Sequence, residues 1–432
     1  MTTPETGIDA ETPAAGSDPD RGHGYRALSR NRDFGLIWVG LATSELGTSV
    51  SGVALPLLVL AVGTSGAITG LIGSVMLLVG WLSQLPAGYL ADRYDRRLLM
   101  VICDAARMVL MAGVTISAFT GRVPVWWVLG VVVVSTMAWA VYMPAEAQAV
   151  RAVVAPEQVP EAVAVSQARA YAVELCGPAL GGLLFSLRRT LPFLVDTVSF
   201  LISLVCVLSV RTSLRPKNPG AVERRFLPSV RAGWQHVWRD PLLRSTTVYS
   251  TAINLSVTTL IYVVIVGEGR GSAGGVTVGV AISGAAAAGL VGSLIAPRAQ
   301  RRLSLRVLLS AAPVLVAVLL LLAARIGNAG VLAVVLAMLT LVSPITNVAI
   351  SALLMVRVPE EIYGRAMSSV SFVATALQPL GPVGAGLLLD HTSLSTALVV
   401  LAAGFLLVTV TGLLVPNPER PATAAHARSV GR

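Results

Sequence analysis

Long apolar runs alternate with short polar segments along almost the whole of this 432-residue chain. Each run holds roughly 18 to 25 residues, about what a helix rising 1.5 Å per residue needs to cross ~30 Å of hydrocarbon. Because lipid offers no partner to exposed N–H and C=O groups, each run is expected to be a helix rather than an open strand. The pattern predicts an all-α membrane protein with twelve transmembrane helices, at 34–62, 69–91, 98–119, 126–148, 165–187, 190–211, 244–268, 274–297, 304–325, 328–352, 366–389 and 394–415.

Composition and charge placement support this prediction and give it an orientation. Hydrophobic residues make up 55% of the chain and charged residues 12%, and the mean hydropathy is +0.77. With both termini placed in the cytoplasm, 25 of the 32 Lys and Arg residues fall in inside segments, as the positive-inside rule requires. The net charge of +10 therefore reports topology, and because it is spread over separate loops no nucleic-acid partner is expected.

The chain contains an internal repeat. "PEQVPEAVAVSQARAYAVELCGPALGGLLF" begins at Pro156, and "PEEIYGRAMSSVSFVATALQPLGPVGAGLLL" begins at Pro359. Their Gly-Pro pairs start at Gly177 and Gly381, so the two copies are offset by 203 to 204 residues. Two pseudo-symmetric six-helix halves are expected. The predicted organisation is a disordered cytoplasmic tail over 1–30, a first half over 31–211, a cytoplasmic linker over 212–243, a second half over 244–415 and a cytoplasmic tail over 416–432.

The segment "GYLADRYDRR", between the second and third apolar runs, concentrates charge in a short hairpin. Its echo in the second half is "GSLIAPRAQRRL", where Gly292 matches Gly88 and Ala296 stands near the place of Asp92. Topology accounts for the arginines, but it does not account for the glycine or the aspartates. The notable positions are Gly88, Asp92, Arg93, Asp95, Arg96 and Arg97.

This hairpin resembles the loop motif G-x-L-A-D-R-x-D-R-R of the major facilitator superfamily. A second stretch, "VELCGPALGG", is similar to the fifth-helix motif of that family's antiporters, with Val173 departing from its first glycine. The matching residues of this second motif are Gly177, Pro178, Gly181 and Gly182. "VALPLLVL", "PAEAQAV", "AGWQHVWRDPLLRS" and "YGRAMSSVS" resemble the exporter branch that includes enterobactin exporters and macrolide efflux proteins.

The resemblance implies the twelve-helix fold of that family and a breakable latch at the hairpin. In this interpretation Asp92 caps a neighbouring helix or pairs with arginine when the halves meet on the cytoplasmic side, while Gly88 permits close backbone approach. The Gly-Pro motif lets its helix bend and pack across the boundary between halves, and it favours export over import.

Charged residues inside apolar runs are the candidates for coupling or substrate contact, because a charge near the bilayer centre normally faces protein or water. Glu45 has no cation three or four residues later and is a candidate to carry a proton or bind a cation; related exporters often place the acid where this chain has Thr48. The alternative is a Glu45 carboxylate paired across helices or solvated near the inner mouth. Asp104 and Arg107, three residues apart, are expected to pair as part of the charge network under the hairpin. The further candidates are Glu174 next to the Gly-Pro kink, Arg169 nearer the cytoplasmic end, and Asp196, expected to be a structural partner.

Polar and aromatic residues in the helices suggest how a cavity between the halves would be lined. The predicted lining residues are Trp139, Tyr142, Asn254, Tyr262, Asn347 and Gln378. In the linker, Phe226, Val230, Trp234, Val237 and Trp238 recur at near-helical spacing and predict an interfacial amphipathic helix.

No enzyme chemistry is indicated. The sequence has no Walker A motif, no G-x-S-x-G motif and no Cys or His cluster at metal-ligand spacing, so neither a cofactor nor a metal is expected. The three cysteines lie in predicted helices and no disulfide is expected.

These features predict a monomeric, multi-pass protein of a bacterial plasma membrane that exports amphiphilic small molecules, drug-like, antibiotic-like or siderophore-like, by proton antiport with alternating access. Two alternatives stay open: an importer of a small metabolite with the same fold, and a transport-inactive sensor or scaffold. Neither the substrate nor the coupling ion can be assigned from these residues.

Overall fold

A computed structural model describes residues 28, 30–215, 234–235, 237–269, 274–326, 329–358 and 360–416. Within these residues the chain is helical and has no strand. The first half contains α2 (Arg32–Ala61), α3 (Gly66–Arg93), α4 (Arg96–Phe119), α5 (Val125–Val153), the 3₁₀ turn η1 (Pro156–Gln158), α6 (Val159–Leu187) and α7 (Leu191–Ser209). The second half contains α9 (Pro241–Gly269), α10 (Gly274–Arg302), α11 (Leu305–Ile326), α12 (Ala329–Arg357), α13 (Glu360–Thr375), α14 (Leu380–His391) and α15 (Leu394–Leu413).

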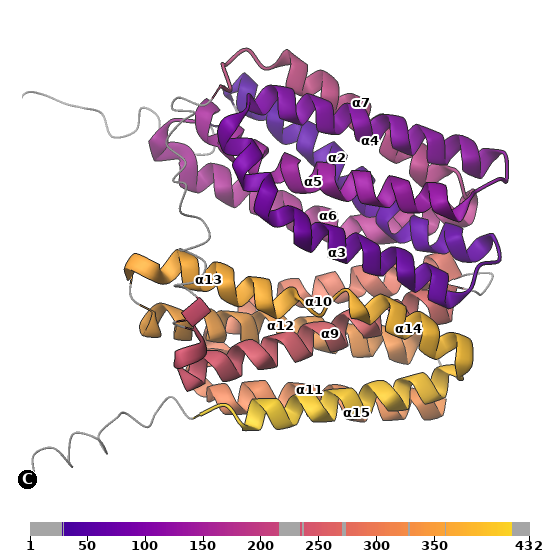
Figure 1. The fold of residues 1–432 in the computed structure, drawn as a ribbon, viewed down its shortest axis with the longest axis vertical. Helices are drawn as coiled ribbons and strands as arrows, with labels where there is room; N and C mark the ends of the chain where they lie inside the picture. The colour runs from indigo at the N-terminus through magenta and orange to yellow at the C-terminus, as the bar shows by residue number, and fades with distance from the viewer. Residues whose placement is uncertain are drawn as a thin grey trace, which may run out of the picture.

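Twelve spans among the described residues are long and apolar enough to cross a membrane, which confirms the predicted number. Figure 1 shows α2 to α7 as one bundle and α9 to α15 as a second bundle beside it. The predicted tails and the start of the predicted amphipathic helix, including Phe226 and Val230, lie outside the described residues.

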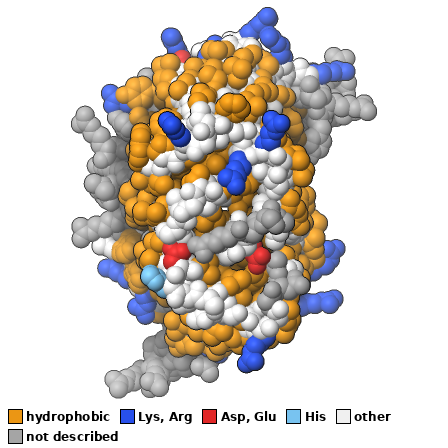
Figure 2. Space-filling view, turned by 90° about the vertical axis from the view of Figure 1, so that its right-hand side faces the viewer, with side chains coloured by type: hydrophobic (Ala, Val, Ile, Leu, Met, Phe, Trp, Pro, Cys, Tyr) orange, Lys and Arg blue, Asp and Glu red, His pale blue; other side chains and the backbone are white. Residues whose placement is uncertain are grey.

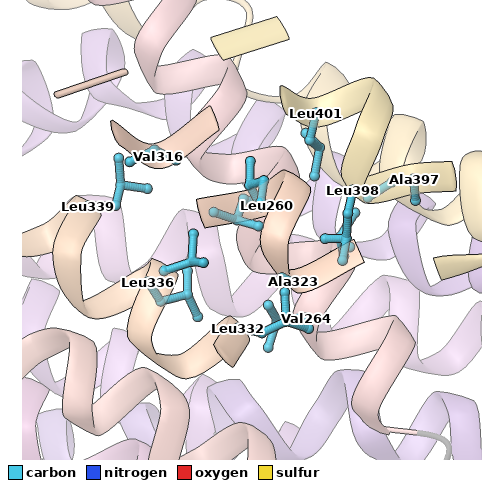
Figure 3. Close-up of a cluster of buried hydrophobic side chains, with 14 of the residues drawn as sticks. Leu260, Val264, Val316, Ala323, Leu332, Leu336, Leu339, Ala397, Leu398 and Leu401 are labelled. Atoms are coloured by element: carbon cyan, nitrogen blue, oxygen red, sulfur yellow. The ribbon is translucent and has the colours of Figure 1, made fainter. Parts of the chain in front are cut away.

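Each half has its own apolar core. In the second half Leu260 and Val264 of α9 pack with Leu336 of α12 and Leu398 of α15 (Figure 3). Similar clusters fill the first half, around Met100 and Tyr142 and around Val131 and Phe193. Apolar side chains also join the halves, because Val53 and Leu57 of α2 pack with Ile265 of α9 and Val278 of α10.

The charged hairpin is more helical than its sequence suggests. Only Tyr94 and Asp95 lie between α3 and α4, and the Asp95 carboxylate caps α4 by accepting from the backbone N–H of Arg97 at 2.9 Å. In the second half Leu303 and Ser304 occupy the same two positions between α10 and α11. Residue 92 therefore corresponds to Arg301, not to Ala296 as the sequence offset suggested.

The eleventh predicted span is not one continuous helix. α13 ends at Thr375 and α14 begins at Leu380, because Pro379 has no N–H and its ring would clash with the carbonyl of the preceding turn. Three side chains donate to the carbonyls before the break: Trp81 Nε1 to Phe372 at 3.0 Å, Thr251 Oγ1 to Val373 at 3.2 Å, and Asn254 Nδ2 to Ala374 at 3.1 Å. The bonds from Trp81 and Asn254 satisfy carbonyl groups that lose their helical N–H partner at the break, whereas the Val373 carbonyl also accepts from the N–H of Ala376 at 3.1 Å.

The halves meet along two seams with matching chemistry, α6 against α10 and α3 against α14. A Cβ added at Gly182 would collide with the Gly275 carbonyl, and one added at Gly386 would collide with the Gly66 carbonyl. In both seams a serine accepts from the backbone N–H that follows the Gly-Pro pair: Ser283 Oγ from Ala179 at 2.9 Å, and Ser74 Oγ from Val383 at 3.0 Å. The predicted packing across the boundary is thus confirmed for Pro178 and Gly182 and recurs in the second copy, whereas Gly177 and Gly181 pack against α2 of their own half.

Among the described residues, an acid reinforces the α3–α14 seam and none is seen to do so in the α6–α10 seam. The Asp390 carboxylate, at the end of α14, accepts from the backbone N–H groups of Gly66 and Ala67 at 2.9 and 2.8 Å. These are the first two donors of α3, which an anion satisfies well. The same spacing in α6 places Ser186, which lies close to Gly275, in the other seam.

Both seams lie at one end of the molecule, where α2 ends at Ala61 and α3 begins at Gly66; we call this the closed end. Figure 2 looks onto it and shows few charged side chains amid hydrophobic ones. Away from it the ribbons of the halves diverge in Figure 1. On α6, Pro178 is buried in the seam, whereas Glu174 and Tyr171, one and two turns earlier on the same face, are exposed.

Substituting Gly386 by Val is predicted to hold the closed end open, because the new side chain would overlap the Gly66 carbonyl. The reporter is Ser74→Cys, a position 8% exposed in the seam, in a protein whose three native cysteines are replaced. We expect faster maleimide labelling of the reporter in the detergent-purified protein.

Gly384→Val provides the matched control, because it lies two residues away on α14 and a Cβ there meets nothing within 4 Å. Equal labelling of the Gly386 and Gly384 variants would show that the glycine contact does not keep this end closed.

Candidate functional site

The first half buries an ionic cluster contributed by three helices. Arg169 of α6 bonds Glu45 of α2 through Nε at 2.9 Å and Nη2 at 3.4 Å. Its Nη1 lies 4.0 Å from Glu146 Oε1 of α5, and the Arg169, Glu45 and Glu146 side chains are 6%, 11% and 8% exposed. One cation thus lies between two acids, so the cluster is neutral only when one acid is protonated.

The contact between Arg169 and Glu146 is incomplete. At 4.0 Å it is too long for a direct hydrogen bond, and Arg169 Nη1 is buried with no hydrogen-bond partner among the described residues. A buried donor without a partner is costly. Protonation of Glu146, or a polar guest between Arg169 Nη1 and Glu146, would therefore change the energy of the cluster.

Glu146 was not among the residues that we singled out from the sequence. The signal was present, because Glu146 is an acid inside the predicted span 126–148, in "PAEAQAV". What the sequence cannot give is its position across the bundle from Arg169. Glu45 agrees with the alternative of a carboxylate paired across helices, because its cation, Arg169, comes from α6.

A second polar network lies deeper in the same half. Arg107 Nη2 bonds Asp104 at 2.7 Å, which confirms the predicted pair, and Asp104 also accepts from Ser203 of α7 at 2.7 Å. The Arg107 guanidinium lies 5.4, 5.0 and 4.5 Å from the ring centres of Trp139, Tyr142 and Phe200. The described partners of this network thus come from α5 and α7, not from the charged hairpin as predicted.

Asp196 behaves as a structural partner. It is fully buried and accepts from Ser51 of α2 at 2.5 Å and from Ser199 at 3.3 Å. A Cβ at Gly47 would meet Asp196 Oδ1 at 2.6 Å, so this glycine lets α2 and α7 approach closely. The Asp196 bonds therefore fix the contact between these two helices.

The predicted cavity residues divide into distinct environments. Tyr142 is fully buried against Arg107, so its prediction as a lining residue was wrong: position along a helix does not give facing. Trp139 stacks on Tyr142 with ring centres 6.4 Å apart, and Tyr262 lies at the boundary of the halves against Gly73. Gln378 lies in the break between α13 and α14, while Asn254 and Asn347 line a cavity in the second half.

The hairpin binds its own half in this structure. Arg97 donates to the carbonyls of Val210 and Thr212 beyond the end of α7. Asp95 also lies 3.3 Å from Arg215, a largely exposed pair that contributes little. The side chain of Asp92 lies outside the described residues, so its role as a latch stays a prediction.

The family model described as Major Facilitator Superfamily matches residues 37–378 and 276–430 of the chain. The chain belongs to this superfamily. The family and the twelve apolar helices make this a multi-pass membrane protein, and both the family and the fold point to a transporter.

Two curated superfamily relatives are similar over part of their length. The chain is 24% identical over 227 residues to the uncharacterised MFS-type transporter YkuC of Bacillus subtilis, covering 50% of this chain and 52% of that protein. It is 25% identical over 202 residues to macrolide efflux protein A of Streptococcus pyogenes, covering 46% of this chain and 50% of that protein. The chain thus spans about half the length of the curated relatives it matches.

Solved superfamily structures share the fold at low sequence identity. The nucleoside transporter NupG, as a D323A mutant, has a TM-score of 0.72 at 11% identity, covering 89% of this chain and 100% of that one. A bacterial homologue of the iron transporter ferroportin has a TM-score of 0.64 at 16% identity, covering 88% and 98%. These likenesses establish the architecture and leave the cargo unassigned.

Replacing Arg107 by Met is predicted to destabilise the protein by about 3–5 kcal/mol, because it leaves the buried Asp104 carboxylate without its cation. The double variant Asp104→Asn, Arg107→Met should recover much of this loss, since no unpaired charge remains. Thermal unfolding in detergent measures both. If the double variant were as unstable as Arg107→Met, packing on the three aromatic rings would outweigh the ion pair.

Proposed function

We propose that this superfamily member is a secondary transporter that exports amphiphilic small molecules in exchange for protons. The observation that carries the proposal is the buried cluster of Glu45, Arg169 and Glu146. Two acids that share one cation have a stable neutral form with a single proton bound. Loss of that proton leaves a net charge of −1, which a cationic cargo or a returning proton can neutralise.

The position of the cluster ties protonation to movement. Arg169 lies on α6, which about two and a half turns later meets α10, where the Pro178 carbonyl lies beside Gly279. A change in the attraction between Arg169 and the two acids therefore acts on the helix that helps to close one end. Alternating access follows if the seams open when the opposite ends of the halves come together.

The orientation of the chain gives this movement a direction. If the termini and charged hairpins lie in the cytoplasm, as the arginine bias predicts, the closed end faces outward and the structure is open to the inside. A plasma membrane location fits this orientation. Cargo would then enter the space between the halves from the cytoplasm or the inner leaflet, as an exporter requires.

Export of a drug-like cargo is supported by the partial similarity to macrolide efflux protein A and by the Gly-Pro motif of the fifth span. The superfamily fold by itself is compatible with either direction. Tyr171 and Glu174, exposed on the seam face of α6, place an aromatic ring near an acid, which suits an amphiphile better than a small, fully polar metabolite.

Proton release from inverted vesicles tests the proposal. Erythromycin or tetraphenylphosphonium is added to vesicles with a preset pH gradient, and collapse of the gradient is followed for the parent protein, Glu45→Gln and Glu146→Gln. We expect substrate-dependent collapse by the parent and its loss in both variants, because each removes an exchangeable proton site beside Arg169.

Glu157→Gln is the matched control, because Glu157 is an exposed acid in η1, away from the ionic cluster. It should retain parental exchange. Exchange by Glu45→Gln and Glu146→Gln at the parental rate would exclude the cluster from the proton path, and cargo movement only toward the cytoplasm would make the protein an importer.

A further inference from the structure

The second half contains a polar cavity of about 90 Å³ between α9, α11 and α12. Six polar residues line it: Tyr249, Ser250, Asn254, Ser343, Thr346 and Asn347. Its other lining residues are apolar, including Pro313 of α11 and Leu339 of α12, and none of its lining side chains carries a charge. It therefore differs in chemistry from the ionic cluster of the first half.

Several of these polar groups have no partner among the described residues. Tyr249 is 2% exposed, yet its hydroxyl makes no hydrogen bond there, and the exposed side chains of Ser343 and Asn347 make none either. Asn254 uses its Nδ2 to bond the Ala374 carbonyl at 3.1 Å and keeps its Oδ1 free for another partner. These hydroxyl and amide groups are therefore available to water or to a polar guest in the cavity.

The other half explains how the cavity arises. α5 and α12 each have 29 residues and are offset by 204, so Trp139 and Tyr142 correspond to Ser343 and Thr346. In the first half the two rings flank the Arg107 guanidinium between α4 and α5. In the second half Ser343 and Thr346 are smaller and leave a space between the corresponding helices α11 and α12. Residues of α9 line the remaining side of this space.

We propose that this cavity is a subsite for an uncharged, hydrogen-bonding group of the cargo, such as a hydroxyl or an amide. About 90 Å³ holds roughly three water molecules, or the end of one substituent of a larger molecule. Two asparagines offer donors and acceptors together, which suits a group that both donates and accepts. An ion would lose its hydration without gaining a counter-ion there.

The subsite also contacts the broken span. Asn254 both lines the cavity and holds the carbonyl of Ala374 just before the break between α13 and α14. A bound group that competes for Asn254 would therefore act on the helix whose second segment, α14, forms a seam. The statement that the bound group belongs to a transported molecule rests on the proposed function. The preference of the cavity for an uncharged, hydrogen-bonding group does not depend on it.

The cavity chemistry is tested without any transport assay. Ser343→Cys, in a protein lacking the native cysteines, is treated with three methanethiosulfonates that carry hydroxyethyl, ethyl or trimethylammonioethyl groups. The reaction rate of each reagent with the protein is divided by its rate with a free thiol in water, which removes differences in intrinsic reactivity between the reagents. We expect the hydroxyethyl reagent to exceed the ethyl reagent about fivefold, since a net hydrogen bond is worth ~1 kcal/mol, and the cation to be slowest.

Two variants make this outcome specific. Asn347→Leu in the same background should abolish the advantage of the hydroxyethyl reagent, because it removes an unpaired amide from the lining. Glu174→Cys, exposed on α6, should show no such advantage. Equal rates for the hydroxyethyl and ethyl reagents with the Ser343→Cys protein, or fastest reaction by the cation, would overturn the proposal.

A transport measurement tests the link to cargo. Ser343→Trp introduces the residue found at the corresponding position of the first half, Trp139, and fills the cavity. The KM for erythromycin in inverted vesicles should therefore rise. Val334→Trp, at an exposed position on the same helix, is the control and should leave the KM unchanged. An unchanged KM in Ser343→Trp would remove the cavity from the transport path. If the parent protein does not transport erythromycin, the proposed function fails for that cargo. The thiol modification rates then still test whether the cavity prefers an uncharged, hydrogen-bonding group.

Discussion

Close backbone contact between glycines is the interaction on which this structure depends. In a membrane, helices gain nothing from hiding apolar surface from water, because lipid is equally apolar, so association relies on packing and hydrogen bonds. Gly182 against Gly275 and Gly386 against Gly66 bring helices of the two halves together with no side chain between them. The serine bonds to Ala179 and Val383 then fix the register of each seam.

The two halves share a fold but divide the chemistry between them. All five charged side chains that are buried among the described residues, Asp104, Arg107, Glu146, Arg169 and Asp196, belong to the first half. The second half has apolar packing and the uncharged cavity at the matching depth. The two copies of the repeat thus share a scaffold, while the buried polar residues of one half are ionic and the cavity of the other half is uncharged.

The sequence predicted the helices well because each apolar run is long and uniform, and it predicted local pairs such as Asp104 with Arg107 because three residues is nearly one turn. The sequence-based predictions failed where the outcome depends on which side of a helix a residue occupies, or on which residues of different helices lie close together. Tyr142 looked available and is fully buried, and Glu45 looked isolated although Arg169 lies beside it. The break at Pro379 was missed because apolar residues continue through it, although the prolines at 379 and 382 were a visible warning.

The carboxylate of Asp390 makes the two seams unequal in a way that the glycines do not. At the α3–α14 seam an anion holds two backbone N–H groups, while the corresponding position of the α6–α10 seam has only the hydroxyl of Ser186. Two otherwise matched joints with unequal strength do not part together. The α6–α10 seam would separate first, while the α3–α14 seam acts as the hinge. The first gap at the closed end then forms beside α6, the helix that carries Arg169.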